Sequence, residues 1–429
     1  MENSKKRIVI LGAGFGGLKA ALEISKELHR LCLRKFYEVV VIDRHSYQTY
    51  QPTLYEAATT SKETANYCDL HQIITFPISD IIAGHPIRMI NDEISELDLI
   101  EGDIHLAHEG KYKFDYLVIA IGAETNYFDI PGLKENALPF KTFIDAITLR
   151  DKIIAAHSDG GAQIKIVIGG AGPTGVEFAG ELQNWLCELN QEMKMACESK
   201  ITLIGSPPIV LPGFLPKISA LAEARLRRLK IEILTSEKIV AVENKKVLLE
   251  SKKEIPYDIL IWTGGVRSSG LMGSLPLKNE GGRVVVMGEM KCLPQTEDLK
   301  LYGRIYALGD AICVYDATTG KPVPMVARAA IEQAKVVAKN IIADIKYEQG
   351  LELMAKHIQF TPREYPYVIP IGGKYAIAKI GSFVFSGFPA WVFKGLIELF
   401  YISSIMPLGR TLKIWLKGLR IFIQNDRLG

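Results

Sequence analysis

After a short polar leader, the chain enters the segment KRIVILGAGFGG, which runs from Lys6 to Gly17. A run of β-branched residues leads into the pattern Gly12-x-Gly14-x-x-Gly17, and a helical pattern follows. The first glycine permits a tight turn, the second lets the backbone approach a pyrophosphate, and the third lets the helix pack closely on the strand. Free N–H groups at the helix start favour phosphate binding. The segment therefore predicts a dinucleotide-binding turn between a strand and a helix.

The same pattern occurs a second time, as IKIVIGGAGPTG beginning at Ile164. Gly12 and Gly170 occupy equivalent places in the two copies and are 158 residues apart. Copies separated by the length of a domain favour two nucleotide-binding domains over a short-period repeat. Apolar runs predict further strands at Glu38–Asp43, Tyr116–Ile121, Ile201–Ile204, Ile231–Leu234, Ile259–Trp262 and Arg304–Leu308, and a long helix at Pro324–Ile342.

An acidic residue normally ends the strand that follows each glycine turn, where it binds the ribose hydroxyls of the dinucleotide. Asp43 has this position after the first turn. After the second turn the position is Gly205, and no Arg replaces the acid. A missing acid removes both the hydrogen bond to the ribose 2′-hydroxyl and the repulsion of a 2′-phosphate. The sequence therefore leaves the choice between NADH and NADPH open.

Length and charge limit the function further. The 429 residues exceed one ordinary domain, and a hydrophobic fraction of 48% excludes wholesale disorder. A net charge of +3 provides no general field for nucleic acid, so no nucleic-acid partner is expected. The N-terminus has no apolar signal-peptide core, so no secretion signal is predicted.

The C-terminal tail has a different composition from the rest of the chain. Residues 387–429 hold six basic and two acidic side chains. Ala390–Ile402 is almost wholly apolar, and Leu408–Ile423 is amphipathic. Neither stretch has the roughly 20 uninterrupted apolar residues that a spanning helix needs. The second has an apolar face of Leu408, Leu412, Trp415, Leu416, Leu419 and Phe422, and a basic face of Arg410, Lys413, Lys417 and Arg420. A basic amphipathic helix is typical of attachment to an anionic membrane surface. The alternative is a helix packed on the protein's own core.

The six cysteines form no CxxC or CxxxxC pair. We therefore expect reduced thiols and no metal site, and the absence of a CxxxxC pair after the first helix excludes a dithiol reductase.

Further segments, in order along the chain, resemble those of the type II NADH:quinone oxidoreductases. The matching segments are Gln51–Ala58 (QPTLYEAA), Ala120–Ala123 with Ile130–Gly132, Lys141–Arg150, Trp262–Val266 (WTGGV) and Gly309–Asp310. The C-terminal pair of predicted helices is similar to that family's monotopic membrane anchor.

This resemblance implies an α/β fold with two Rossmann-like dinucleotide-binding domains, in which an inserted NAD(P)H domain splits the FAD domain, plus a membrane-associated helical segment. The implied boundaries are 1–125 and 288–386 for the FAD domain, 126–287 for the NAD(P)H domain and 387–429 for the anchor. The implied activity passes a hydride from NADH or NADPH to tightly but non-covalently bound FAD, and two electrons to a membrane quinone, without proton pumping. The implied location is peripheral, on the cytoplasmic-type face of a membrane, and a homodimer is compatible with the family.

The resemblance also implies site residues. Those for FAD are Gly12, Gly14, Phe15, Gly16, Gly17, Asp43, Arg44, Gly122, Gly309, Asp310, Ala327, Arg328 and Lys374. Those for the nicotinamide dinucleotide are Gly170, Gly172, Pro173, Thr174, Gly175, Gly264 and Gly265. Glu177 is the expected catalytic residue, because a partly buried carboxylate can relay a proton to the quinone. The alternative is an acid favoured by the helix dipole near the start of a helix.

One segment departs from the family pattern. Arg328 and Glu332 replace two glutamines that the family carries beside the flavin and the quinone, and their spacing predicts an ion pair on one helical face. Three other functions compete with this one. A sulfide:quinone reductase needs cysteines at the flavin, and none lies near Ala120–Pro131. A reductase of a protein electron carrier and a low-turnover NAD(P)H-sensing flavoprotein both stay open.

Overall fold

The computed structural model describes residues 5–160, 164–192, 194, 199–296, 302–316 and 319–425. The chain forms two compact units, each assembled from three separate segments. The first unit comprises residues 1–48, 76–124 and 267–364, and the second comprises 49–75, 125–266 and 365–429. The four residue ranges expected from the sequence for the domains and the anchor stay a prediction.

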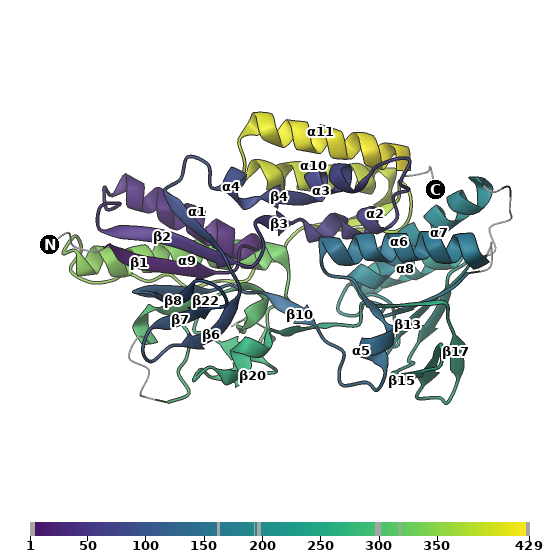
Figure 1. Cartoon of the computed structure of the whole chain (residues 1–429), viewed down its shortest axis with the longest axis horizontal. Coiled ribbons are helices and arrows are strands. Elements are labelled where there is room, and N and C mark those ends of the chain that lie inside the picture. The colour runs from purple at the N-terminus through teal and green to yellow at the C-terminus, as the bar shows by residue number, and fades with distance from the viewer. Residues whose placement is uncertain are drawn as a thin grey trace. The chain divides into compact units, whose positions relative to one another are not determined.

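The first unit is built on a five-stranded parallel sheet in the order β22-β9-β1-β2-β5. Its strands are β1 (Lys6–Leu11), β2 (Tyr37–Asp43), β5 (Ile87–Asn91), β9 (Tyr116–Ile119) and β22 (Ile305–Ala307). Helices α1 (Phe15–Arg30) and α9 (Ala327–Glu348) pack against each other within this unit (Figure 1). The residues at 8–11 of β1 are fully buried, as expected for a strand inside a covered parallel sheet.

The second unit repeats this plan with a five-stranded parallel sheet in the order β11-β18-β12-β13-β14. Its strands are β11 (Leu138–Pro139), β12 (Lys165–Gly169), β13 (Lys200–Gly205), β14 (Glu232–Thr235) and β18 (Ile259–Trp262). Its main helices are α6 (Phe143–Gly160), α7 (Pro173–Glu192) and α8 (Pro216–Arg228) (Figure 1). Both sheets therefore have the Rossmann plan, and the predicted fold class is confirmed.

Smaller elements complete the two units. They are β3 (Tyr47–Thr49), α2 (Leu54–Ala58), α3 (Tyr67–Ile74), β4 (Thr75–Pro77), α4 (Ile78–Ile81), β6 (Ile94–Asp98), β7 (Asp103–Leu106), β8 (Gly110–Lys113), β10 (Ala123–Thr125), α5 (Leu133–Asn136), β15 (Ile239–Glu243), β16 (Lys246–Leu249), β17 (Glu254–Pro256), β19 (Val266–Ser268), β20 (Asn279–Glu280), β21 (Arg283–Val285), β23 (Ile312–Cys313), β24 (Tyr367–Pro370), β25 (Ala376–Ile380) and β26 (Phe383–Gly387).

The C-terminal tail folds into α10 (Phe388–Ser403) and α11 (Leu408–Asn425), which pack on each other in the second unit (Figure 1). Among the described residues, no helix combines the length and the apolar character needed to cross a bilayer. One side of the tail joins the core of the second unit, through Ile421 and Phe422. The expected single apolar face of α11 is therefore divided, because Phe422 is buried whereas Leu408 and Leu416 are exposed.

The expected separation of charges on α11 is also only partial. The Nζ atom of Lys417 lies 2.8 Å from Asp69 Oδ1 and 2.7 Å from Gln72 Oε1, both on α3. This basic side chain thus binds the protein itself, while Arg410, Lys413 and Arg420 stay exposed.

The expectation of six reduced thiols is wrong, because Cys187 is disulfide-bonded. Cys32, Cys68, Cys292 and Cys313 are free, and Cys197 lies outside the described residues.

Candidate functional site

The first glycine turn joins β1 to α1 and cannot tolerate side chains at its ends. Gly12 has φ +98°, and a Cβ atom there would lie 2.4 Å from the carbonyl oxygen of Ala120. A Cβ on Gly17 would lie 1.9 Å from the carbonyl oxygen of Gly12. A Cβ on Gly14, by contrast, would meet nothing within 4 Å. The turn therefore leaves open space at the glycine that should face a pyrophosphate, and α1 begins directly behind it at Phe15.

The later part of the chain returns to this turn within the first unit. A Cβ atom on Gly16 would lie 2.3 Å from Leu308 Cδ1, so the residue that follows β22 (Ile305–Ala307) and precedes Gly309-Asp310 lies against the first helix. This contact brings Asp310, predicted to serve FAD, into the unit that carries the first glycine turn.

Asp43 ends β2 and contacts the glycine turn directly. Its Oδ2 accepts a hydrogen bond from the backbone N–H of Ala13 at 2.7 Å, and its Oδ1 accepts one from His45 at 2.8 Å. The acid is therefore fixed beside the turn, as binding of a ribose would require. The guanidinium of Arg44, also predicted to serve FAD, lies 3.7 Å from Glu93 Oε1, and its flavin role stays a prediction.

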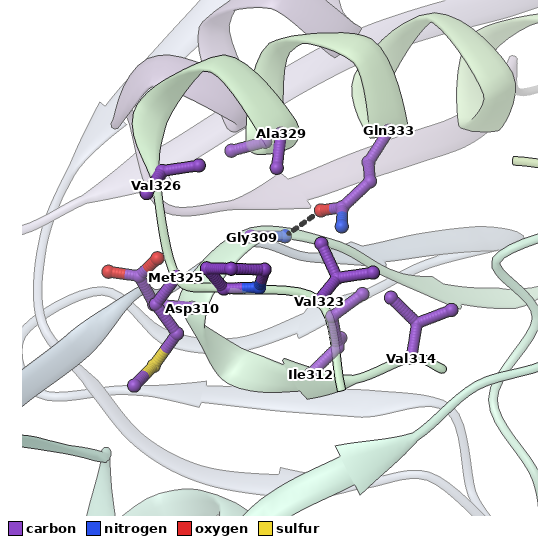
Figure 2. Close-up of a pocket in the computed structure, with 11 residues that line it drawn as sticks. Gly309, Asp310, Ile312, Val314, Val323, Met325, Val326, Ala329 and Gln333 are labelled. Atoms are coloured by element: carbon purple, nitrogen blue, oxygen red, sulfur yellow. Dashed lines mark hydrogen bonds between the residues drawn. The ribbon is translucent and has the colours of Figure 1, made fainter. Parts of the chain in front are cut away.

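A pocket lies between the Gly309 turn and the start of α9 (Figure 2). Gly309 has φ +74°, and its N–H donates to Gln333 Oε1 at 2.8 Å. Val326 gives α9 no side-chain cap, and the first turn of α9 holds no acid. The first N–H groups of α9, beginning at Ala327, thus lie beside the pocket without a side-chain cap, an arrangement that favours an electron-rich ligand atom.

Arg328 and Glu332 form the expected ion pair, with Nη2 3.3 Å from Oε1. Lys335 approaches the same Glu332 oxygen at 3.0 Å. Both residues thus interact along one face of α9, and the pairing prediction is confirmed. Their place beside a quinone stays a prediction.

The second glycine turn, between β12 and α7, repeats the geometry of the first. Gly170 has φ +118°, and a Cβ atom there would lie 2.6 Å from the carbonyl oxygen of Thr263. A Cβ on Gly175 would lie 1.9 Å from the carbonyl oxygen of Gly170, and one on Gly172 would meet nothing within 4 Å. The two turns are therefore equivalent in space as well as in sequence. Pro173 and Thr174, also expected at this site, are the exposed first residues of α7.

The remaining predicted glycines lie in turns that follow strands. Gly122 follows β9 with φ +72° and open space around it. Gly264 and Gly265 follow β18, where a Cβ on Gly264 would lie 2.3 Å from the Trp262 ring. Lys374 lies in the turn between β24 and β25 of the second unit, whereas the first glycine turn belongs to the first unit.

The turn that carries Lys374 is held by helices of its own unit. The buried Arg225 of α8 donates to the carbonyl oxygens of Ile371, at 3.1 Å, and Gly372, at 2.8 Å. Glu181 of α7 accepts from the N–H of Gly373 at 3.1 Å. These bonds give the turn a packing role inside the second unit, and the flavin role of Lys374 stays a prediction.

The helix dipole acts most strongly within the first helical turn. Glu177 is the fifth residue of α7, so it lies just beyond that turn. Its carboxyl group is packed among protein atoms, and this desolvation raises its pKa to about 8. Lys394 lowers this pKa and Glu56 raises it, but neither effect is as large as that of burial. Burial therefore favours the protonated form of Glu177.

Glu56 and Lys394 form a buried ion pair in the second unit. Glu56, on α2, is 1% exposed, and the Lys394 side chain, on α10, is 14% exposed. Their charged atoms are in direct contact, and the ammonium group also lies 5.0 Å from the centre of the Tyr55 ring. Glu398, one turn after Lys394, is buried as well, and burial raises its pKa while Lys394 lowers it. A cluster of carboxylates around one lysine thus connects the start of α7 to the C-terminal tail.

Glu56, Lys394 and Glu398 are site residues that were not predicted from the sequence. A signal was present, since Lys394 and Glu398 are the only charges in an otherwise apolar stretch and stand four residues apart. Charges that persist in such a stretch are expensive to bury and are usually paired.

Two parallel sheets, each with a glycine-rich turn that leads into a helix, define an oxidoreductase with two dinucleotide-binding units. The chain belongs to the pyridine nucleotide-disulphide oxidoreductase family, whose sequence model matches residues 6–334.

Individual relatives narrow the comparison. The chain is 28% identical over 352 residues to the type II NADH:quinone oxidoreductase of Staphylococcus aureus, a match that covers 80% of this chain and 83% of that one. The solved structure of NDH2 from Plasmodium falciparum in complex with NADH matches with a TM-score of 0.82 and 18% identity, over 99% of this chain and 100% of the other. The sulfide:quinone oxidoreductase of Aquifex aeolicus matches with a TM-score of 0.74 and 18% identity, over 96% of both chains. The resemblance seen in the sequence is thus confirmed.

Proposed function

We propose that this protein is a type II NADH:quinone oxidoreductase, which passes a hydride from a nicotinamide dinucleotide to FAD and two electrons to a membrane quinone. The observation that carries this proposal is the duplicated glycine turn, with equivalent geometry in the two units. Two dinucleotide sites in one chain fit one resident flavin and one exchangeable nicotinamide. The similarity to the Staphylococcus aureus enzyme supports the same assignment.

The first unit has the residues that FAD would need. The open space at Gly14 accommodates a pyrophosphate, and Asp43 is fixed where it can bind the ribose. Asp310 and the first N–H groups of α9, at Ala327, lie at the pocket beside Gly309. When bound, FAD supplies two-electron chemistry that accepts a hydride and delivers electrons to a quinone. We expect these residues to hold the flavin tightly but without a covalent bond.

The second unit would bind the donor through its own glycine turn. The backbone around Gly172 leaves room for the donor's pyrophosphate, and the start of α7 directs N–H groups and a positive dipole end toward it. Gly264 and Gly265 follow the neighbouring strand β18, at the same end of the sheet.

Glu177 would hold the proton that quinone reduction requires. Reduction of a quinone to a quinol takes up two protons, and a carboxyl group with a pKa of about 8 can release one near neutral pH. The Glu56–Lys394 pair keeps a fixed positive charge near Glu177, and this charge prevents a still higher pKa. The chain thus has an acid with a raised pKa next to a buried ion pair.

The tail would attach the protein to a membrane. Phe388, Val392, Leu396 and Phe400 follow each other at four-residue intervals on α10, and their exposed fractions lie between 41% and 64%. Leu408, Leu412 and Leu416 continue an exposed apolar surface on α11. Exposed apolar surfaces of this kind mark binding sites, and the exposed cations of α11 suit anionic lipid headgroups. Attachment would be peripheral, on the cytoplasmic-type face, where the membrane supplies the quinone.

The test mixes purified protein with NADH and a short-chain quinone, and follows loss of the reduced-nicotinamide absorbance band. Loss that is rapid and depends on the quinone supports the proposal. Reduction of the flavin without quinone turnover contradicts it and favours the two alternatives, a reductase of a protein electron carrier or an NAD(P)H-sensing flavoprotein.

A further inference from the structure

The structure confirms that Gly205 occupies the place of the missing acid. In both units the first glycine of the turn donates its N–H to the isoleucine carbonyl one residue before this place, at 2.8 Å. Asp43 therefore has its spatial counterpart in Gly205. The first unit has a carboxylate at the end of this strand, and the second has none.

Neighbouring atoms already fill the space that an acid at residue 205 would need. A Cβ atom on Gly205 would lie 2.6 Å from Ala171 Cβ. Ala171 is itself fixed, because its carbonyl oxygen accepts a hydrogen bond from Leu211 N–H at 2.8 Å. The second unit must therefore recognise a ribose from some other position.

The loop after β14 brings an acidic residue, Glu237, next to this place. Thr235, the last residue of β14, is the register partner of Gly205. Ser236 then adopts a left-handed conformation with φ +56°, and Glu237 donates its N–H to the Gly205 carbonyl oxygen at 3.2 Å. Glu237 is thus hydrogen-bonded to the residue that lacks the acid.

The first unit makes the same backbone contact but uses its carboxylate differently. There Asp92 N–H donates to the Asp43 carbonyl oxygen at 3.1 Å. The buried Asp92 carboxylate accepts the backbone N–H groups of His108, at 3.0 Å, and Glu109, at 2.8 Å. It also contacts the His108 ring at 2.7 Å. Asp92 therefore holds its own loop, and Asp43 serves the dinucleotide.

Glu237 has no comparable structural role. It is half-buried, and within the described part of the chain its carboxylate forms no hydrogen bond or ion pair. The acidic residue next to this place thus ends the second strand of the sheet in the first unit, Asp43, and lies in the loop after β14 in the second unit, Glu237.

We propose that Glu237 binds the adenosine ribose hydroxyls of the donor and makes the second unit select NADH over NADPH. This inference rests on the proposed function, because it concerns the donor site of that reaction. A carboxylate accepts hydrogen bonds from the 2′- and 3′-hydroxyls of NADH. The same charge repels the 2′-phosphate of NADPH.

Binding of ADP-ribose and of 2′-phospho-ADP-ribose, measured by calorimetry on the intact protein, tests the inference without flavin chemistry. The parent protein should bind ADP-ribose more tightly. Glu237→Gln should weaken ADP-ribose binding about tenfold, the usual scale for a lost hydrogen bond to a charged group. The same variant should bind the 2′-phosphorylated probe no more weakly than the parent does.

Glu250→Gln is the matched control, because Glu250 N–H bonds to the carbonyl oxygen of Lys238 in the same loop at 2.9 Å. This variant removes a nearby negative charge and should leave both affinities unchanged. The inference is overturned by an unchanged affinity ratio in Glu237→Gln, by an equal effect of Glu250→Gln, or by tighter binding of the 2′-phosphorylated probe to the parent. If Glu237→Gln changes the ratio of the two affinities but the parent protein reduces no quinone, the inference stands and only the proposed function is refuted.

Discussion

The buried pair of Glu56 and Lys394 gives the strongest prediction about the tail. Lys394→Met keeps most of the side-chain length but removes the cation that lies against a carboxylate only 1% exposed. Removal of one partner from a buried ion pair costs about 3–5 kcal/mol, because the other charge is left uncompensated. We therefore expect a loss of that size in the free energy of unfolding.

The same substitution should move the titration of Glu177. Lys394 lowers the pKa of Glu177, so its removal should raise that pKa above its present value of about 8. If quinone reduction needs protonated Glu177, activity declines as the pH rises through this pKa. The declining limb of the pH–rate profile should then move upward by about one pH unit, equivalent to roughly 1.4 kcal/mol.

Denaturant unfolding and pH–rate profiles of four proteins test both expectations. Lys417→Met is the matched control, since its pair with Asp69 has side chains 35% and 36% exposed and should cost at most about 1 kcal/mol. Glu56→Gln combined with Lys394→Met should recover most of the lost stability, because a neutral amide needs no counter-ion. The reasoning would be refuted if Lys394→Met and Lys417→Met lost equal amounts of unfolding free energy. It would also be refuted if the declining limb of the pH–rate profile moved to lower pH in Lys394→Met.

Three further predictions concern other parts of the molecule. The folded-state pKa of Glu177 is about 8, above its usual value of 4.5, so the folding stability should fall as the pH rises from 4.5 to 8. Thermal melts across this pH range should show that this contribution is absent in Glu177→Gln. Gly14→Ala should abolish flavin binding with little loss of stability, because the new Cβ atom would meet no protein atom within 4 Å. Gly17→Ala should abolish flavin binding and also lower stability, because its Cβ atom would lie 1.9 Å from a backbone carbonyl oxygen. Absorbance spectra measure the bound flavin, and melting curves measure the stability. Leu396→Ser with Phe400→Ser should abolish flotation with anionic vesicles at an unchanged melting temperature, since both side chains are more than half exposed; vesicle binding equal to the parent's would contradict the membrane role.

The sequence predicted the sheets well because local patterns determine them. The run Ile259–Trp262 is β18 itself, and the glycine patterns mark both turns. Helix α9 was placed less well: the expected span was Pro324–Ile342, whereas the helix begins at Ala327 and ends at Glu348. Its start is later because Val326 is still extended, with φ −132° and ψ 144°.

Contacts distant in sequence account for what the local patterns missed. The last turns of α9 are held by Asp344, which accepts from Tyr306 at 2.5 Å, and by Glu348, which accepts from Tyr116 at 2.9 Å. The Glu56–Lys394 pair joins residues 338 positions apart, so no local pattern could predict it. Such buried pairs depend on the folded packing, which the periodicity of one segment does not contain.

Anaerobic spectroscopy of the purified, flavin-reconstituted protein tests the central proposal most directly. We expect a yellow protein whose flavin absorbance bleaches when one equivalent of NADH is added and returns when a short-chain quinone follows. A preparation that takes up no flavin, or a bound flavin that NADH leaves oxidised, would contradict the proposal that the two glycine turns bind a flavin and its electron donor.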